Sequence, residues 1–207
     1  MNARNHGKTR RLTGLALFTA LVVILQLLGS FVRFGPFSIS LVAMPIVIGA
    51  ALYGAGAGLW LGFVFGMVVL ISGDAAAFLA VHVPGTILVV LAKGALCGGA
   101  AGLVYSLLQR ANRTVGAVAA AVICPVVNTG IFLLGCLVFF MPTITGWATA
   151  MGFENVGTYM ILGLVGANFL FELGANILLC PTILRLIRIG KKDESKPLYE
   201  AERKQLP

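Results

Sequence analysis

Residues 39–72 decide the fold, and they read ISLVAMPIVIGAALYGAGAGLWLGFVFGMVVLIS. This stretch contains no charged side chain, and its two apolar runs are separated only by the small-residue sequence Gly54-Ala55-Gly56. Uncharged apolar runs of this kind are typical of helices that lie in a membrane. The stretch therefore predicts two short membrane helices joined by a tight turn.

The rest of the chain has the same character. Of its 207 residues, 59% are apolar and only 11% are charged, before the 26 glycines are counted. An average soluble domain is about 45–50% apolar even with glycine included. Together with a mean hydropathy of +0.99, this composition excludes a soluble globular protein and a disordered chain. We predict an all-α membrane protein.

Six apolar segments emerge when hydropathy is read in windows of about 19 residues. They cover residues 12–31, 39–53, 55–72, 85–108, 115–140 and 157–187. We therefore expect six transmembrane helices in a compact bundle. The expected organisation is a basic N-terminus over residues 1–11, a membrane domain over 12–190 and a polar, loosely ordered tail over 191–207.

The positive charges are placed as the flanks of membrane helices require. The net charge is +8, and the basic side chains gather in the first eleven residues, in the loop between the fourth and fifth segments, and from Arg185 onward. The loops on the opposite face contain a single basic residue, Arg33. By the positive-inside rule both termini are expected in the cytoplasm. We therefore interpret these charges as residues that set the topology and contact the headgroups of the lipid bilayer, and not as a surface that binds nucleic acid.

A few polar side chains lie inside the apolar segments. Lys93 is in the fourth segment and Asn128 in the fifth, while Asn168, Glu172 and Asn176 recur every fourth residue of the sixth, on one helix face. A charge at membrane depth is costly and usually marks a functional site.

At about 1.5 Å per residue, Lys93, Asn128, Asn168 and Glu172 fall roughly 12–22 Å below the outer surface. We therefore predict that these four residues line a ligand pocket reached from outside. The alternative is a structural Lys93–Glu172 pair, with the asparagines bridging helices.

Motifs for catalysis are missing from the sequence. It contains no Walker sequence, no HExxH, no GxSxG and no paired carboxylates. The four cysteines lie in apolar segments without CxxC spacing, as expected for small buried hydrophobes. We therefore predict no enzymatic activity, no metal site and no cofactor.

Small residues repeat at four-residue spacing in three segments. Ala16 and Ala20 do so in the first, and glycines in the third and fourth. The glycines concerned are Gly54, Gly58, Gly62 and Gly66, followed by Gly94, Gly98 and Gly102. Such stripes let helix backbones approach closely, and packing within the chain is their simplest interpretation.

Several stretches resemble one family. The sequence LALFTAL at residues 15–21 resembles the first helix of substrate-binding (S) components of energy-coupling-factor (ECF) vitamin transporters. The sequence ISLVAMPIVIGA at 39–50, followed by Tyr53-Gly54 and Gly58, resembles their second helix and its turn. Asn128-Thr129-Gly130 and the sequence NFLFE at 168–172 are similar to that family too.

The resemblance implies a subunit of the prokaryotic plasma membrane that captures a vitamin or related micronutrient outside the cell. It would deliver the ligand inward together with a membrane-embedded T component and two ATPase subunits. Ala16 and Ala20 would form the docking surface for the T component, and Arg33, Phe34 and Phe37 would belong to a lid over the ligand.

Two points stay open from the sequence. A lysine beside asparagines favours an anionic ligand with amide or hydroxyl groups, such as pantothenate, but riboflavin, folate, biotin and nucleobase derivatives are alternatives. The competing function is a stand-alone secondary transporter that uses Lys93 and Glu172 as a proton relay.

Overall fold

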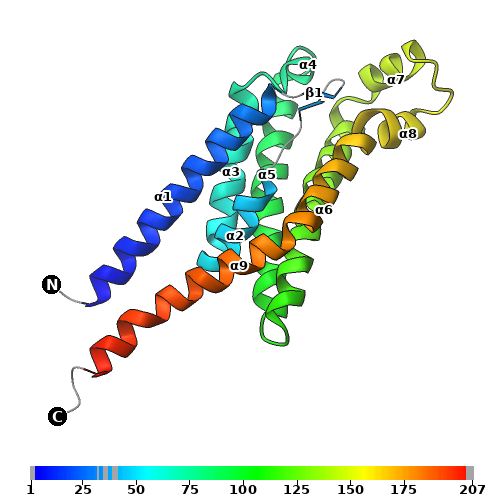
Figure 1. Cartoon of the computed structure of the whole chain (residues 1–207). Helices are drawn as coiled ribbons and strands as arrows, with labels where there is room; N and C mark the ends of the chain where they lie inside the picture. The colour runs from blue at the N-terminus through cyan, green and yellow to red at the C-terminus, as the bar shows by residue number, and fades with distance from the viewer. Residues whose placement is uncertain (1–2, 32, 35–36, 39–41, 204–207) are drawn as a thin grey trace.

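The computed structural model describes the backbone of residues 3–31, 33–34, 37–38 and 42–203, and the side chains of residues 8–31, 42–166 and 168–189. The described chain is almost entirely helical, which confirms the all-α class (Figure 1). In order, its elements are α1 (Ala3–Ser30), β1 (Arg33–Phe34), β2 (Phe37–Ser38), α2 (Ala43–Tyr53), α3 (Ala55–Ile71), α4 (Ala76–Leu79), α5 (Val83–Leu108), α6 (Arg113–Phe139), α7 (Met141–Ala150), α8 (Val156–Thr158), the π-helix η1 (Tyr159–Gly166) and α9 (Ala167–Arg203).

Each of the six predicted segments contains a helix, but the helices differ in length. In the described part of the chain, four stretches are long and apolar enough to cross a membrane: Lys8–Ser30, Val83–Leu108, Arg113–Phe139 and Asn168–Ile189. Helix α2 has 11 residues and α3 has 17, so α2 rises only about 16 Å against a hydrocarbon layer of about 30 Å. Six complete crossings therefore stay a prediction.

The turn between α2 and α3 is as tight as the sequence suggests. Gly54 alone separates the two helices and has φ +92°, a conformation that glycine adopts at little cost. Its N–H donates to the carbonyl of Ala50, and its own carbonyl accepts from Gly58 N–H. One residue thus ends α2 and starts α3.

The glycine stripes form a seam between α3 and α5. A Cβ on Gly62 would overlap the carbonyl oxygen of Gly94, and a Cβ on Gly58 would overlap that of Gly98. At the two ends of the seam, a Cβ on Gly66 would lie 2.8 Å from the Val90 carbonyl oxygen, and one on Gly102 would lie 2.6 Å from Ala55 Cα. This close approach confirms that the stripes pack within the chain.

Two hydrophobic clusters hold the helices together. The larger one joins α1, α2, α3, α5, α6 and α9, with Leu61, Tyr105 and Ile183 fully buried in it. The second joins α4, α6, α7 and η1 around Phe140 and Ile144. Residues of both clusters line the cavity described below.

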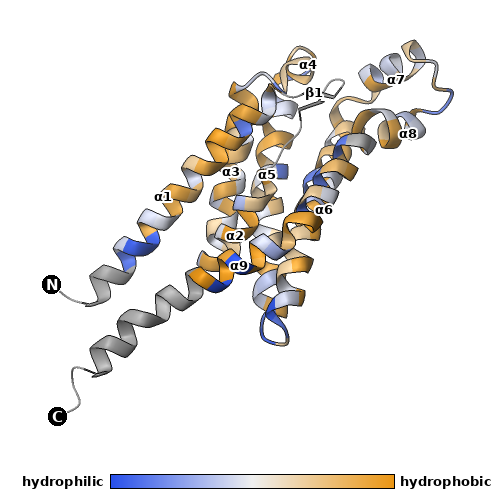
Figure 2. Ribbon diagram, in the orientation of Figure 1, coloured by the Kyte–Doolittle hydropathy of each residue, from blue (hydrophilic) through white to orange (hydrophobic). Residues whose placement is uncertain are grey.

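The two ends of the molecule differ in composition. The first residues of α1, the last residues of α9 and the α5–α6 connection lie at one end, and α4, α7 and α8 lie at the other (Figure 1). Hydrophilic residues mark the lower part of α1 and the α5–α6 connection (Figure 2). This arrangement agrees with the prediction that both termini lie on the same side of the membrane.

Two expectations about the C-terminal part are wrong. Residues 191–203 were expected in a loosely ordered tail, but they are helical, because α9 continues through Arg203. The sixth segment is also not one uniform α-helix, because residues Tyr159–Gly166 form a π-helix before α9 begins.

A candidate ligand-binding cavity

A cavity lies where the two hydrophobic clusters meet. It is partly open to solvent, and all four predicted pocket residues line it. The lining residues come from α1, α3, α4, α5, α6, α9 and the turns beside them: Gln26, Phe65, Val69, Asp74, Ala75, Phe78, Thr86, Val89, Val90, Lys93, Asn128, Phe132, Phe140, Asn168 and Glu172. Residues far apart in the sequence are thus brought to one site.

Lys93 is held by aromatic rings and not by a carboxylate. Its Nζ lies 5.3 Å from the ring centroid of Phe132 and 5.8 Å from that of Phe65, within the range of cation–π attraction. Among the described residues, Lys93 and Glu172 form no ion pair at an N···O distance of 4.0 Å or less. The alternative interpretation was a structural Lys93–Glu172 ion pair. The geometry does not show this direct pair, although both residues line the same cavity.

The α6 and α9 side chains supply buried polar groups. Glu172 is 4% exposed and Asn128 is 9% exposed. Asn128 Oδ1 accepts no hydrogen bond within the described part of the chain, and a buried unsatisfied acceptor costs about 1–3 kcal/mol. Asn168 is half-buried and lines the cavity.

Asn176 shares the α9 face of Asn168 and Glu172 but has a different partner. Its Nδ2 donates to the carbonyl of Ala121 at 3.4 Å, and it does not line the cavity. The stripe predicted from the sequence therefore divides into two cavity residues and one residue that joins α9 to α6.

Sequence reasoning missed a polar network at the cavity wall. Gln26 is 1% exposed, and its Nε2 donates to Asp74 Oδ2 at 2.8 Å, an oxygen that also accepts from Ser72 Oγ at 3.1 Å. Neither Gln26 nor Asp74 is among the candidate residues named from the sequence. The one feature of the sequence that could have revealed this network is Gln26 itself, a polar residue within the first apolar segment.

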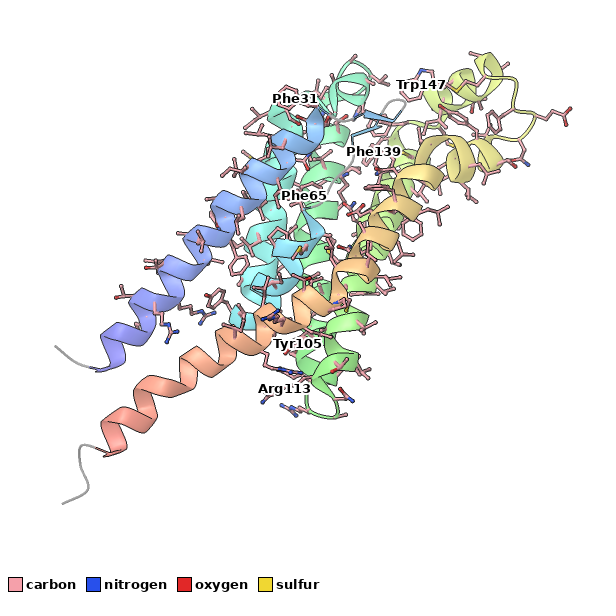
Figure 3. The ribbon with its side chains drawn as sticks, in the orientation of Figure 1. Phe31, Phe65, Tyr105, Arg113, Phe139 and Trp147 are labelled. Carbon is pink, nitrogen blue, oxygen red and sulfur yellow. The ribbon has the colours of Figure 1, made fainter. Side chains whose placement is uncertain are left out.

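Aromatic side chains gather at the end of the molecule that carries α4 and α7. The Phe78 ring makes edge contacts with Phe132, Phe140 and Trp147, at centroid distances of 5.4, 5.0 and 5.6 Å. Figure 3 labels Trp147 beside α7 at this end and Arg113 at the opposite end. Phe78, Phe132 and Phe140 also line the cavity, so aromatic rings form part of its wall.

The lid residues Arg33, Phe34 and Phe37 lie in an antiparallel hairpin, with Arg33 opposite Ser38 and Phe34 opposite Phe37. Their side chains lie outside the described ones, so their role stays a prediction. Strand β1 is at the same end of the molecule as α4 (Figure 1).

The predicted docking residues are on the outer surface of α1. Ala16 and Ala20 are both exposed, as are Leu17, Leu21 and Ile24 beside them. Internal packing of this face would require both alanines to be buried in the bundle, and neither is buried. The face is therefore available to lipid or to another subunit.

A family model described as "ECF transporter, substrate-specific component" matches residues 10–184. The chain belongs to this family. The resemblance seen in the sequence is thus confirmed over most of its length. Members of the family are transporter subunits, so the chain is assigned to transport. No curated protein and no solved structure matches the chain.

Proposed function

We propose that this ECF S component captures a vitamin or related micronutrient in the cavity lined by Lys93, Asn128, Asn168 and Glu172. The observation that carries the proposal is the convergence of these four polar side chains, from three helices, on one cavity inside an otherwise apolar bundle. Ionisable residues at such depth are rare unless they serve binding or transport.

The chemistry of the lining suggests the class of ligand. The Lys93 ammonium, flanked by Phe65 and Phe132, is suited to a carboxylate or another anionic group. Asn128 Oδ1, which has no partner in the described part of the chain, is suited to an amide or hydroxyl donor. A pantothenate-like molecule combines a carboxylate, an amide and hydroxyl groups, and is our first candidate.

Transport requires partners that this chain does not supply. We assign ATP hydrolysis to two ATPase subunits and energy coupling to a membrane-embedded T component, which docks on the α1 face around Ala16 and Ala20. In this arrangement the subunit lies in a prokaryotic plasma membrane with both termini cytoplasmic, and the 33–38 hairpin covers the ligand from outside.

Uptake of radiolabelled pantothenate, followed by riboflavin, folate and biotin, tests the proposal in cells that lack their own transporters for these compounds. We expect uptake of one compound only when the T and ATPase subunits are co-expressed, and loss of uptake when the ATPases are inactivated. Uptake by this chain alone that stops when the proton gradient is collapsed would instead support the stand-alone transporter.

A further inference from the structure

A second hollow lies between α1 and the start of α3, away from the ligand cavity. It is open to solvent and is lined by Lys8, Arg11, Leu12, Leu15, Gly56 and Ala57. We call these six residues the basic groove. It lies at the end of the molecule that carries the start of α1, where Figure 2 shows hydrophilic residues.

The groove combines a basic rim with an apolar floor. Lys8 and Arg11 supply two positive charges, and the other lining residues are leucine, glycine and alanine. The carboxylates described in the structure belong elsewhere, because Asp74 and Glu172 line the ligand cavity and Glu154 follows α7. The N-terminus of α3 adds a partial positive charge of its own.

One of the two cations at the rim, Arg11, is held in place by a hydrogen bond. Arg11 Nη2 donates to the carbonyl oxygen of Tyr53, the last residue of α2, at 2.8 Å. This bond satisfies a helix-end carbonyl and fixes the guanidinium beside the α2–α3 turn. Farther along the same helices, Trp60 Nε1 donates to Thr19 Oγ1 at 3.1 Å, which joins α1 to α3 beyond the groove.

We propose that the basic groove binds one anionic phospholipid of the leaflet that surrounds this end of the molecule. The phosphate lies between Lys8 and Arg11, and the start of an acyl chain lies against Leu12, Leu15 and Ala57. An anionic headgroup satisfies the two charges, and a hydrocarbon chain fits the apolar floor, a combination that neither a soluble anion nor a neutral lipid supplies.

Two substitutions separate the groove from general surface charge. Gly56→Leu places a bulky side chain in the groove, at a position where nothing lies within 4 Å of an added Cβ. Its matched control is Gly146→Leu, an equally open site on α7 at the other end of the molecule. Lys8→Gln removes one charge from the rim, and Arg113→Gln removes one from the α5–α6 end without touching the groove.

The test is native mass spectrometry of protein purified with an equal mixture of phosphatidylglycerol and phosphatidylcholine. We expect the wild type to retain phosphatidylglycerol, and Gly56→Leu and Lys8→Gln to retain about fivefold less, which corresponds to about 1 kcal/mol. Both control variants should behave as the wild type.

Three results would overturn the proposal. These are equal retention of the two lipids by the wild type, unchanged phosphatidylglycerol in Gly56→Leu, and equal losses in Lys8→Gln and Arg113→Gln. If Gly56→Leu keeps the lipid but no longer captures the T component, the groove is a protein interface instead.

Discussion

Lys93 keeps its ammonium between two phenylalanine rings, in a cavity that also contains the carboxylate of Glu172. Cation–π attraction is weaker than a charge–charge contact, so a half-buried lysine can still gain stability from an anionic partner. In our proposal, the bound ligand supplies that anionic group. At the scale of single residues, this arrangement makes Lys93 the side chain on which ligand affinity should depend most.

Substitution of the cavity residues should weaken binding in a defined order. Lys93→Ala is expected to cost about 2–5 kcal/mol, because it leaves a buried ligand charge unpaired. Asn128→Ala and Asn168→Ala should each cost about 1–3 kcal/mol, the penalty for a buried polar group without a partner. Titration calorimetry with the identified ligand measures all three.

Asn176→Ala is the matched control for these variants. It removes an asparagine from the same face of α9, but one that bonds the Ala121 carbonyl outside the cavity. It should lower stability by about 0.5–1.5 kcal/mol and leave affinity unchanged. Affinities within threefold of the wild type for all three cavity variants would place the site elsewhere, and normal binding by a folded Lys93→Ala/Glu172→Ala variant would favour the structural-pair alternative.

The sequence identified four cavity residues, because polar side chains stand out in apolar segments and helical rise gives their depth. It did not identify Gln26 and Asp74, which meet across 48 positions of the chain. It also did not distinguish Phe65 and Phe132 from phenylalanines that face lipid, since hydropathy is the same for both. Contacts of this kind depend on how the helices rotate about their axes, which periodicity alone does not fix.

At the scale of elements, the α3–α5 seam is the closest helix–helix contact that the glycines create. Lipid is as apolar as the side chains, so helices in a membrane gain stability mainly from close packing of their backbones. Gly58 and Gly62 face Gly98 and Gly94 across this seam. The seam positions α3 and α5, and with them Phe65 and Lys93 at the cavity wall.

Gly62→Ala should destabilise the protein, because the new methyl group would overlap the Gly94 carbonyl and force α3 and α5 apart. We expect a loss of about 1–3 kcal/mol, as for overpacked cores. Gly130→Ala, where nothing lies within 4 Å of the added Cβ, should be neutral or stabilising by up to about 1 kcal/mol. Unfolding in mixed detergent micelles measures both, and equal stability of the two variants would contradict the seam.

Hydropathy predicted the helical segments well and the irregular elements poorly. It cannot distinguish the π-helix η1 from an α-helix, because both bury the same apolar side chains and differ only in hydrogen-bond register. It also did not predict α7, which begins directly after the fifth segment and is separated from α6 by Phe140 alone. The α2–α3 turn was predictable because Gly54 supplies the required positive φ.

At the scale of the whole molecule, binding and docking are assigned to different surfaces. The cavity lies inside the helix bundle, with Phe78 and Phe140 in its lining, whereas Ala16 and Ala20 lie on the exposed face of α1. A subunit built in this way can lose one activity and keep the other. The proposed transport cycle needs both.

Ala16→Trp and Ala20→Trp should therefore separate binding from transport. A bulky ring on the exposed α1 face prevents close approach of a partner helix, and neither Ala16 nor Ala20 lines the cavity. We expect ligand affinity within about twofold of the wild type, together with loss of T-component capture and of uptake. Pull-down and ligand binding on the same preparation measure this, and unimpaired uptake by both variants would disprove the docking assignment.

The central claim is that the cavity around Lys93 holds a small micronutrient, and extraction of the purified protein tests it most directly. Wild type and Lys93→Ala are purified side by side in detergent, and small molecules released by denaturation are identified by mass spectrometry. The account predicts one small anionic metabolite, near one per protein in the wild type and at least about tenfold depleted in Lys93→Ala. Equal amounts of the same metabolite in both preparations, or none in the wild type, would contradict it.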